Sequence, residues 1–311
     1  MKLTRRELLR LGAGAGLAAL VGWRPGRASA ALDPTAPDDL ITKAIPSSGE
    51  RVPVVGVGTR NYRADLDGDL TPYRETIRAF VEGGGTVVDT APSYGNSESV
   101  LGKVIGDLGV RDRLFLATKV DRRGERAGVE RMEASLRKLG TDRVELMQVH
   151  NLRDWRTQIP TLRAWKEKGR IRYLGVTTSF EGQYEELERV MRAETLDFIQ
   201  VDYALDSRSA GERILPLARD RGMAVLINLP FGRGRLFRAV GDRALPGWAR
   251  ELGCESWAQV FLKYVVSHPA VTAAIPGTTK PEHMRDNLGA ARGQLPDADV
   301  RRRMEAFADG L

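Results

Sequence analysis

Four residues that can take part in proton transfer stand at, or just beyond, the ends of apolar segments. Asp89 ends the segment TVVD, Lys119 ends LFLATK, and His150 ends VELMQVH. Tyr94 follows Asp89 by five residues. A charged or titratable group at the end of a buried strand carries a large desolvation cost unless it is paired. We therefore expect the four side chains to converge in one site.

These four residue types together suit the reduction of a carbonyl group. A tyrosine phenol has a reference pKa of about 10, and a neighbouring ammonium lowers that pKa because it stabilises the phenolate. Lys119 can supply the ammonium if Asp89 holds it, and His150 can hydrogen-bond the carbonyl oxygen. The set contains no hydride source, so the hydride must come from a cofactor.

Taken one at a time, the same residues have simpler explanations. Asp89 fits a helix N-cap or a structural ion pair, Lys119 a surface position, His150 a hydrogen-bonded core histidine, and Tyr94 a loop aromatic. Their joint order and spacing favour the site. A strand-end lysine also fits a barrel lyase or isomerase that forms a Schiff base, which remains an alternative.

Strands and helices alternate through nearly all of the chain after residue 40. Apolar, β-branched runs predict strands near 54–58, 86–89, 114–118, 144–149, 173–177, 197–201, 224–228 and 271–275. Amphipathic stretches between them predict helices over 72–82, 97–107, 128–139, 158–168, 183–192, 209–221, 256–267 and 281–291. Gly140 supplies a C-terminal stop for the third of these helices.

Eight such units closing on themselves make a (β/α)8 TIM barrel, in which the C-terminal ends of the strands build the active site. An open doubly wound sheet is the alternative, but it usually carries G-x-G-x-x-G after its first strand. Residues 56–61 (GVGTRN) lack the third glycine. Residues 41–55 predict a β-hairpin that plugs the bottom of the barrel, and 297–311 predict an extra C-terminal helix. The long connection 229–250 suits either a flap over a ligand or surface decoration.

The segments around the candidate site resemble the aldo-keto reductase family. They are VVDTAPSYGNSE (87–98), LFLATKV (114–120) and VELMQVHN (144–151). The resemblance continues through GVTTSF, FIQVDYALDSR, LINLPFGRGRL and AIPGTTKPEHMRDN, and covers about residues 41–293. It implies the barrel fold and NADPH as the hydride donor. It also implies Tyr94 as general acid, Lys119 and Asp89 as the groups that tune it, and His150 as the group that orients the substrate carbonyl.

The resemblance further implies which residues contact the nicotinamide, namely Thr59, Thr177, Thr178 and Gln200. Thr178 stands where relatives often have Asn. Asn228 lies near the position where many relatives stack an aromatic ring on the nicotinamide. Ordinary strand-end polarity explains Thr177 equally well.

Two later segments match those that in the family contact the phosphates and the adenine of the cofactor. The loop whose backbone contacts the pyrophosphate is matched by Pro230, Phe231, Gly232 and Gly234. The 2′-phosphate site is matched by Thr278, Thr279 and Lys280, just before a helix whose free N–H groups favour anions. Asn287 matches an adenine contact, and an exposed helix position is its alternative. Many relatives have Lys and Arg where this chain has Gly277 and His283, so NADPH is expected and NADH is possible.

Charge and composition exclude other kinds of site. The chain has 311 residues and 42% hydrophobic content, enough for one large barrel. The first 30 residues hold six basic and one acidic residue, so they account for +5 of the net charge of +7. The remaining +2, without a basic cluster interleaved with aromatics, argues against nucleic acid. Cys254 is the only cysteine and the three histidines are scattered, so neither an internal disulfide nor a metal site is expected.

The first 30 residues have the three parts of an export signal in order. Arg5 and Arg6 precede the uncharged stretch LGAGAGLAALVGW, which is too short and too rich in Gly and Ala for a membrane span. Small residues at 28–30 then suit cleavage. The pattern resembles a twin-arginine signal and implies the twin-arginine export machinery as a partner. A mature periplasmic or exported bacterial protein without a membrane span would result; a helical or disordered tail is the alternative.

We therefore divide the chain into a signal peptide (1–30), a linker (31–40) and an aldo-keto reductase-like barrel (41–311). The expected partner is a small-molecule carbonyl substrate, and the expected state is a monomer or weak oligomer. Tyr62 and Trp155 are candidates to line the mouth or to pack against loops. A non-catalytic NADP(H)-binding sensor or accessory subunit is the second function, because NADPH is not readily renewed outside the cytoplasm.

Overall fold

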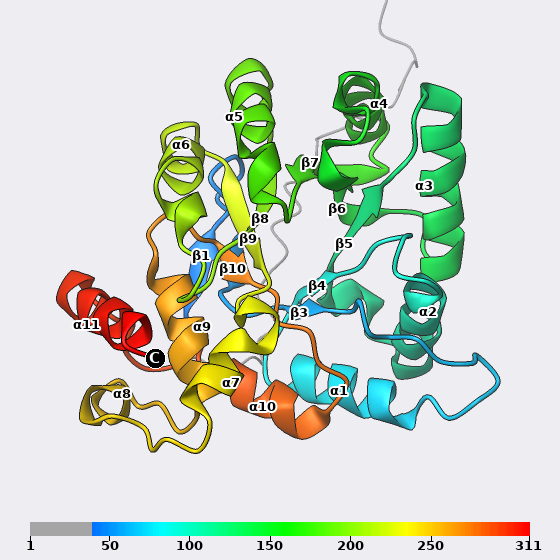
Figure 1. The fold of residues 1–311 in the computed structure, drawn as a ribbon. Coiled ribbons are helices and arrows are strands. Elements are labelled where there is room, and N and C mark those ends of the chain that lie inside the picture. The colour runs from blue at the N-terminus through cyan, green and yellow to red at the C-terminus, as the bar shows by residue number, and fades with distance from the viewer. Residues whose placement is uncertain (1–38) are drawn as a thin grey trace, which may run out of the picture. The chain divides into compact units, whose positions relative to one another are not determined.

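The computed structural model describes residues 39–311, which form a barrel of parallel strands surrounded by helices (Figure 1). Its strands are β3 (Val57–Gly58), β4 (Val87–Asp89), β5 (Phe115–Val120), β6 (Val144–Val149), β7 (Ile171–Thr177), β8 (Phe198–Asp202), β9 (Ala224–Asn228) and β10 (Ala273–Ala274). Hydrogen bonding follows chain order from β3 to β10. Parallel bridges from Val55 to Ala274 and from Gly58 to Gly277 bring the first and last strands together. The predicted (β/α)8 barrel is therefore confirmed, and the open doubly wound sheet is excluded.

The helices that cover the barrel fall close to their predicted ranges. They are α1 (Thr71–Glu82), α2 (Ser97–Leu108), α3 (Glu125–Leu139), α4 (Trp155–Glu167), α5 (Tyr184–Ala193), α6 (Ile214–Asp220), α9 (Trp257–Ser267) and α10 (Pro281–Gly289). The main difference is α6, which was predicted to begin at residue 209. Pro216 has no N–H for a helical hydrogen bond and is tolerated in a first turn. The helix therefore starts at Ile214, after a separate 3-10 turn (Ser209–Gly211).

An N-terminal hairpin closes one end of the barrel. Strand β1 (Thr42–Ala44) pairs antiparallel with β2 (Arg51–Pro53). Ile45 and Val52 join an inner cluster that includes Phe115 and Phe198, the first residues of β5 and β8. The hairpin thus plugs the end where the strands begin, as predicted, and leaves the strand C-termini for a site.

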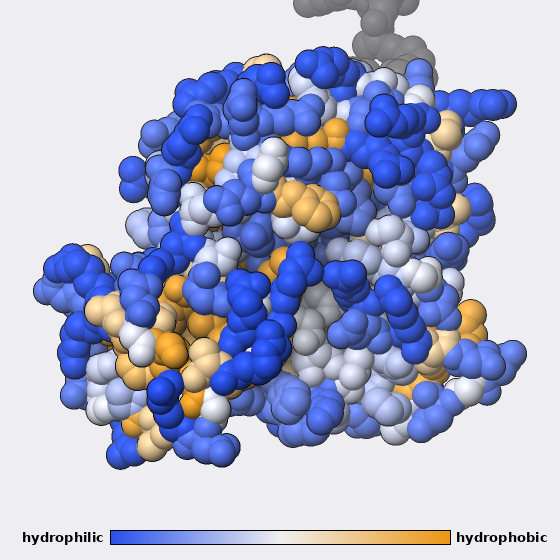
Figure 2. Space-filling view, viewed as in Figure 1, coloured by the Kyte–Doolittle hydropathy of each residue, from blue (hydrophilic) through white to orange (hydrophobic). Residues whose placement is uncertain are grey.

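The connection after β9 is folded rather than irregular. It contains the short helices α7 (Arg235–Val240) and α8 (Gly247–Glu251). Phe237 packs between Phe231 and Phe261, with ring centroids 4.9 and 5.5 Å away. A further helix, α11 (Ala298–Asp309), ends the chain as predicted, and Figure 2 shows apolar side chains gathered around α8 and α9.

The predicted signal peptide and most of the predicted linker lie outside the described residues. Within residues 39–311, no helix combines the length and apolar character needed to cross a membrane.

Candidate active site

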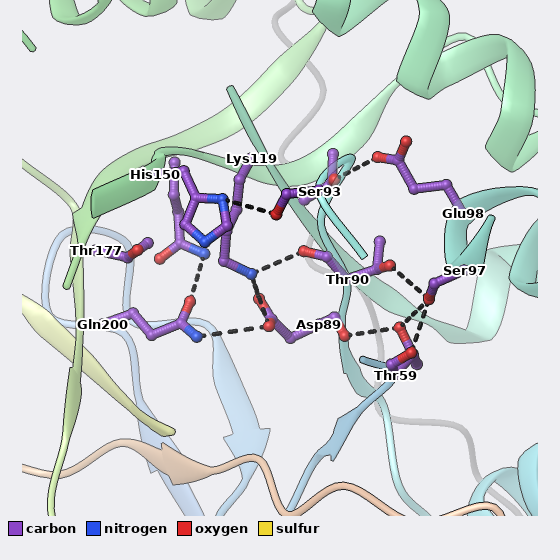
Figure 3. Close-up of polar contacts among 12 residues, drawn as sticks. Thr59, Asp89, Thr90, Ser93, Ser97, Glu98, Lys119, His150, Thr177 and Gln200 are labelled. Carbon is purple, nitrogen blue, oxygen red and sulfur yellow. Dashed lines mark hydrogen bonds and ion pairs between the residues drawn. The ribbon is translucent and has the colours of Figure 1, made fainter. Parts of the chain in front are cut away.

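A buried ion pair lies at the C-terminal end of the barrel. Lys119, on β5, donates from Nζ to both carboxylate oxygens of Asp89, the last residue of β4, at 2.8 and 2.7 Å (Figure 3). It donates a third hydrogen bond to the carbonyl of Thr90 at 2.7 Å. The two charged side chains are only 1% and 3% exposed. Because an ammonium has three donors, this arrangement satisfies all of them and compensates for burial.

The ion pair keeps the lysine charged. Burial by itself lowers the pKa of Lys119, but attraction to Asp89 and Tyr94, together with hydrogen bonds to both, outweighs burial, and the pKa lies above its usual value. A permanent positive charge therefore sits beneath the mouth of the barrel.

Tyr94 lies over this charge, on the loop between β4 and α2. The Nζ atom of Lys119 is 5.4 Å from the centroid of the Tyr94 ring. The ring meets that of His150 edge to face, with centroids 6.0 Å apart. Gly95 takes a left-handed φ of 70°, which turns the chain directly after Tyr94. The structure thus brings all four predicted residues together.

His150 begins a short 3-10 turn (His150–Leu152) immediately after β6. Its Nδ1 atom lies 3.4 Å from the hydroxyl of Ser93. Burial, assisted by the positive charges of Lys119, Arg153 and Arg60, lowers the pKa of His150 to about 3. The imidazole is therefore neutral at physiological pH and retains one N–H to donate.

Gln148 belongs to the same network but was not predicted. Its Nε2 donates to Oε1 of Gln200 at 2.9 Å, and Nε2 of Gln200 points to Oδ2 of Asp89 at 3.5 Å. Both glutamines are buried. Side chains alternate along a strand, so a residue two positions before His150 shares its face. That alternation is the signal that could have identified Gln148.

Two of the predicted cofactor residues have hydrogen-bond partners within the protein. The hydroxyl of Thr59 is fully buried, donates to the carbonyl of Asp89 at 3.0 Å and contacts the hydroxyl of Ser97. The hydroxyl of Thr178 donates to Gln183 at 2.6 Å and accepts from the backbone N–H of Phe180. Both side chains brace loops, and their contact with a cofactor stays a prediction.

Thr177 and Gln200 lie closer to the catalytic candidates. They are paired across β7 and β8, and the hydroxyl of Thr177 lies 3.4 Å from the backbone N–H of Asn151, next to His150. Asn228, at the end of β9, has a buried Oδ1 without a hydrogen-bond partner among the described residues. A buried acceptor of this kind usually has a partner, so Asn228 marks a place for an external donor.

The glycine-rich loop after β9 is held in an unusual conformation. Positive φ angles occur at Leu229, Gly232, Arg233 and Gly234. A Cβ at Gly232 would lie 2.3 Å from the carboxylate of Asp206, which also forms an ion pair with Arg235 at 2.9 Å. Pro230 is buried and Phe231 partly buried. Glycine at residue 232 therefore avoids a clash with the Asp206 side chain and accommodates a positive φ of 55°.

The start of α10 has the features of an anion site. The backbone N–H of Lys280 donates to the hydroxyl of Thr278 at 3.1 Å and shapes the turn that contains Thr279. Lys280 and Arg285 are exposed, and the first turn of a helix leaves N–H groups free. Asn287 is only 3% exposed, so its alternative interpretation as an exposed helix residue is wrong.

The two candidates for the mouth have different positions. Tyr62 is fully buried and packs on Tyr73 with ring centroids 5.1 Å apart, so it does not line the mouth. Trp155, the first residue of α4, is partly buried and donates from Nε1 to Glu186 at 3.0 Å.

Chemically, the arrangement can deliver a proton and stabilise an oxyanion. It combines a charged ammonium, a phenol and a neutral imidazole within one open end of the barrel. Within residues 39–311, no cluster of His, Cys, Asp or Glu could hold a metal ion.

Comparisons with known proteins extend over the barrel. A model described as "Aldo/keto reductase family" matches residues 56–307. The chain is 30% identical to methylglyoxal reductase YeaE of Escherichia coli (strain K12) over 266 residues, which cover 83% of this chain and 92% of that protein. It is 25% identical over 296 residues to the NADH-specific methylglyoxal reductase of the same organism, covering 77% and 88%.

Solved structures show the same likeness. An aldo-keto reductase from Klebsiella pneumoniae in complex with NADPH superposes with a TM-score of 0.72 at 26% identity, covering 86% of this chain and 95% of the other. The region matched by the family model includes all four residues that converge at the mouth.

Proposed function

The chain belongs to the aldo/keto reductase family, and from this premise we propose that it reduces small-molecule aldehydes or ketones to alcohols with NADPH as hydride donor. One observation carries the proposal. The ammonium of Lys119, paired with the carboxylate of Asp89, lies beneath the Tyr94 ring and beside a neutral His150. Relatives named as reductases and a solved NADPH complex support the same activity.

Each residue of the site has a distinct part in this reaction. When bound, the dinucleotide supplies the hydride. The hydroxyl of Tyr94 donates its proton to the carbonyl oxygen as negative charge develops there. The ammonium of Lys119 stabilises the phenolate that remains, and Asp89 holds that ammonium in place. The N–H of neutral His150 donates a hydrogen bond to the same oxygen and orients the carbonyl.

The residues around the mouth fit a dinucleotide. The unpaired Oδ1 of Asn228 offers an acceptor for the amide N–H group of a nicotinamide. Gln200 and Thr177, paired across β7 and β8, are further polar side chains at the strand ends. The loop Pro230–Gly234 would approach the pyrophosphate, and the first turn of α10 with Lys280 would bind the adenosine phosphate.

Preference for NADPH over NADH rests on the start of α10. Lys280 and Arg285 supply two exposed cations there, which suits a 2′-phosphate. NADH remains possible, because Gly277 and His283 replace cations and one relative is NADH-specific. Titration of the purified protein with both nucleotides, followed by fluorescence, measures this preference directly.

The activity is tested with the Tyr94→Phe variant. We expect the wild-type protein to oxidise NADPH with a reactive carbonyl, and methylglyoxal is the first to try because relatives are named for it. Removing the acidic hydroxyl should lower kcat roughly 100- to 10,000-fold while the Kd for NADPH stays unchanged. Retained turnover in Tyr94→Phe would reject Tyr94 as the acid.

A non-catalytic sensor or accessory subunit is not favoured, because the acid, the ion pair and the neutral histidine are all present. NADPH binding without turnover across a broad carbonyl panel would reinstate it.

We also propose that residues 1–30 are a twin-arginine signal, that 31–40 are a linker, and that the mature barrel acts in the periplasm or beyond it. The paired arginines, the short uncharged stretch and the small residues at 28–30 support this proposal. Fractionation of cells that express the wild type or an Arg5→Lys/Arg6→Lys variant tests it. Equal periplasmic amounts of both forms would contradict it.

A further inference from the structure

We infer that Arg131 is a positioning residue for Tyr94, through a clamp that ties the Tyr94 loop to the end of the Lys119 strand. Arg131 lies on α3 and is outside the group of four residues already described. The inference rests on the proposed reductase function, because it concerns where the acid stands relative to the ammonium.

The clamp consists of three hydrogen bonds from one guanidinium. The Nε atom of Arg131 donates to Oδ1 of Asp121 at 3.0 Å, and Nη2 donates to Oδ2 at 3.3 Å. The same Nη2 donates to the carbonyl of Pro92 at 3.0 Å. A planar guanidinium that engages both carboxylate oxygens is held in a defined orientation. The direction of the third bond, to Pro92, is therefore defined as well.

The two ends of the clamp are close in sequence to the reacting groups. Asp121 follows Lys119 by two residues, directly after β5. Pro92 precedes Tyr94 by two residues. Arg131 thus joins the backbone that carries the phenol to the strand that carries the ammonium.

This ion pair is largely shielded from solvent, so water screens the attraction between its charges less than in a surface pair. The side chains of Arg131 and Asp121 are 20% and 12% exposed, whereas exposed pairs contribute little. Arg122 and Arg153 also contact Asp121, at Oδ1 (3.0 Å) and at the carbonyl (3.4 Å). Of these three arginines, all in the described part of the chain, Arg131 is the one that also bonds the Tyr94 loop.

The Tyr94 loop needs such an anchor because the chain turns at a glycine directly after Tyr94. After Tyr94, Gly95 has a left-handed φ of 70°, and the side chain of Asn96 donates to the carbonyl of Ala64. The Pro92 carbonyl is therefore held two residues before Tyr94, between the hydrogen-bonded carbonyl of Thr90 and the Ser93 hydroxyl, and Asn96 is held two residues after it. A shift of about 1 Å in a catalytic group can lower the rate roughly 100-fold. Loss of the hydrogen bond to Pro92 should therefore lower kcat.

The test compares Arg131→Met with Arg137→Met. Arg137 lies on the same helix, is exposed, and serves as the matched control. We expect Arg131→Met to lower kcat roughly 10- to 100-fold with the Kd for NADPH unchanged, and Arg137→Met to behave like the wild type. Arg131→Lys keeps the positive charge but lacks the planar guanidinium that bonds both carboxylate oxygens. It should retain more of kcat than Arg131→Met. If Arg131→Met folds poorly, Arg131→Lys replaces it as the test variant.

A double-mutant cycle separates positioning from a merely structural role. If Arg131 acts through the phenol, Arg131→Met should change the residual single-turnover rate of Tyr94→Phe by less than about twofold. An equal loss in both backgrounds, or a kcat of Arg131→Met within twofold of the wild type, would overturn the inference.

Hydrogen–deuterium exchange gives a readout that needs no turnover. Amides of residues 90–96 should exchange faster in Arg131→Met than in Arg137→Met. Unchanged exchange there would also overturn the inference. If the wild type has no reductase activity but the amides of residues 90–96 exchange faster in Arg131→Met, the result counts against the reductase function and not against the clamp.

Discussion

At the scale of single residues, the site depends on charges whose desolvation is offset by specific partners. Burial by itself disfavours the charged form of a lysine, yet the two oxygens of the Asp89 carboxylate and the carbonyl of Thr90 accept three hydrogen bonds that keep Lys119 charged. His150 has the opposite outcome, because its positive neighbours and its burial keep the imidazole neutral. The two residues therefore provide an electrostatic stabiliser and a neutral donor within one small region.

His150 leads to a prediction about the pH dependence of activity. Its pKa of about 3 lies below the reference value of 6.5, so the imidazole gains a proton only as the pH falls far below neutrality. Between about pH 5 and pH 8, where an unperturbed histidine titrates, kcat should show no acidic limb due to this residue. An acidic limb with a midpoint near 6.5 in the wild type that disappears in His150→Asn would contradict the prediction.

At the scale of elements, close packing of helices against each other positions the strand ends. Helices α2 and α3 approach closely at Gly102, where an added Cβ would lie 2.1 Å from the carbonyl of Lys138. Helix α2 begins three residues after Tyr94, and α3 carries Arg131. The distance between these helices therefore influences both ends of the Arg131 clamp.

This contact predicts opposite effects for two glycines on one helix. Gly102→Ala should destabilise the protein by about 1–3 kcal/mol, because the added methyl overpacks the helix contact. Gly106→Ala, where an added Cβ meets nothing within 4 Å, should stabilise it by about 0.5–1 kcal/mol, because alanine favours the helix. Urea unfolding midpoints measure both changes. A Gly102→Ala variant as stable as Gly106→Ala would show that the helices separate without cost.

At the scale of the whole molecule, the barrel is secured between its hairpin plug and its last helices. The ammonium of Lys43 in β1 donates to the carbonyls of Val266, His268 and Val271 at 2.7, 2.9 and 2.7 Å. His268 accepts at Nδ1 from the backbone N–H of Ala270 at 3.2 Å. This junction joins the first strand to the end of α9, so it couples segments more than 220 residues apart.

The same junction should make the fold sensitive to acid. Burial, followed by the charges of Arg301 and Lys43, lowers the pKa of His268 to about 4 from 6.5. Between pH 6.5 and pH 4 the unfolded chain therefore binds a proton at His268 that the folded chain does not bind. The stability that neutral His268 contributes is complete above pH 6.5 and is lost as the pH falls towards 4. The free energy of unfolding should fall less steeply over that range in His268→Gln.

The control for this prediction is His283→Gln, since His283 is exposed on α10. Parallel pH profiles of urea unfolding for the wild type, His268→Gln and His283→Gln provide the measurement. Equal slopes in wild type and His268→Gln would show that His268 does not limit acid stability.

The sequence by itself determined the order of strands and helices, the hairpin, the terminal helix and the four residues that converge at the mouth. These follow from local patterns, because apolar periodicity specifies each element and strand ends in a barrel meet on one side. The helix start at Ile214 was also within reach of the sequence, since Pro216 favours it.

Only the tertiary structure decided which polar groups pair. Gln148 with Gln200, Thr59 with Asp89 and Arg131 with Pro92 are separated by 52, 30 and 39 residues. No local pattern records such distances, because a hydrogen bond requires two atoms within about 3 Å and the fold alone sets that separation. The burial of Tyr62 and Asn287 has the same cause: neighbouring elements, rather than the residues beside them in the chain, exclude water from these side chains.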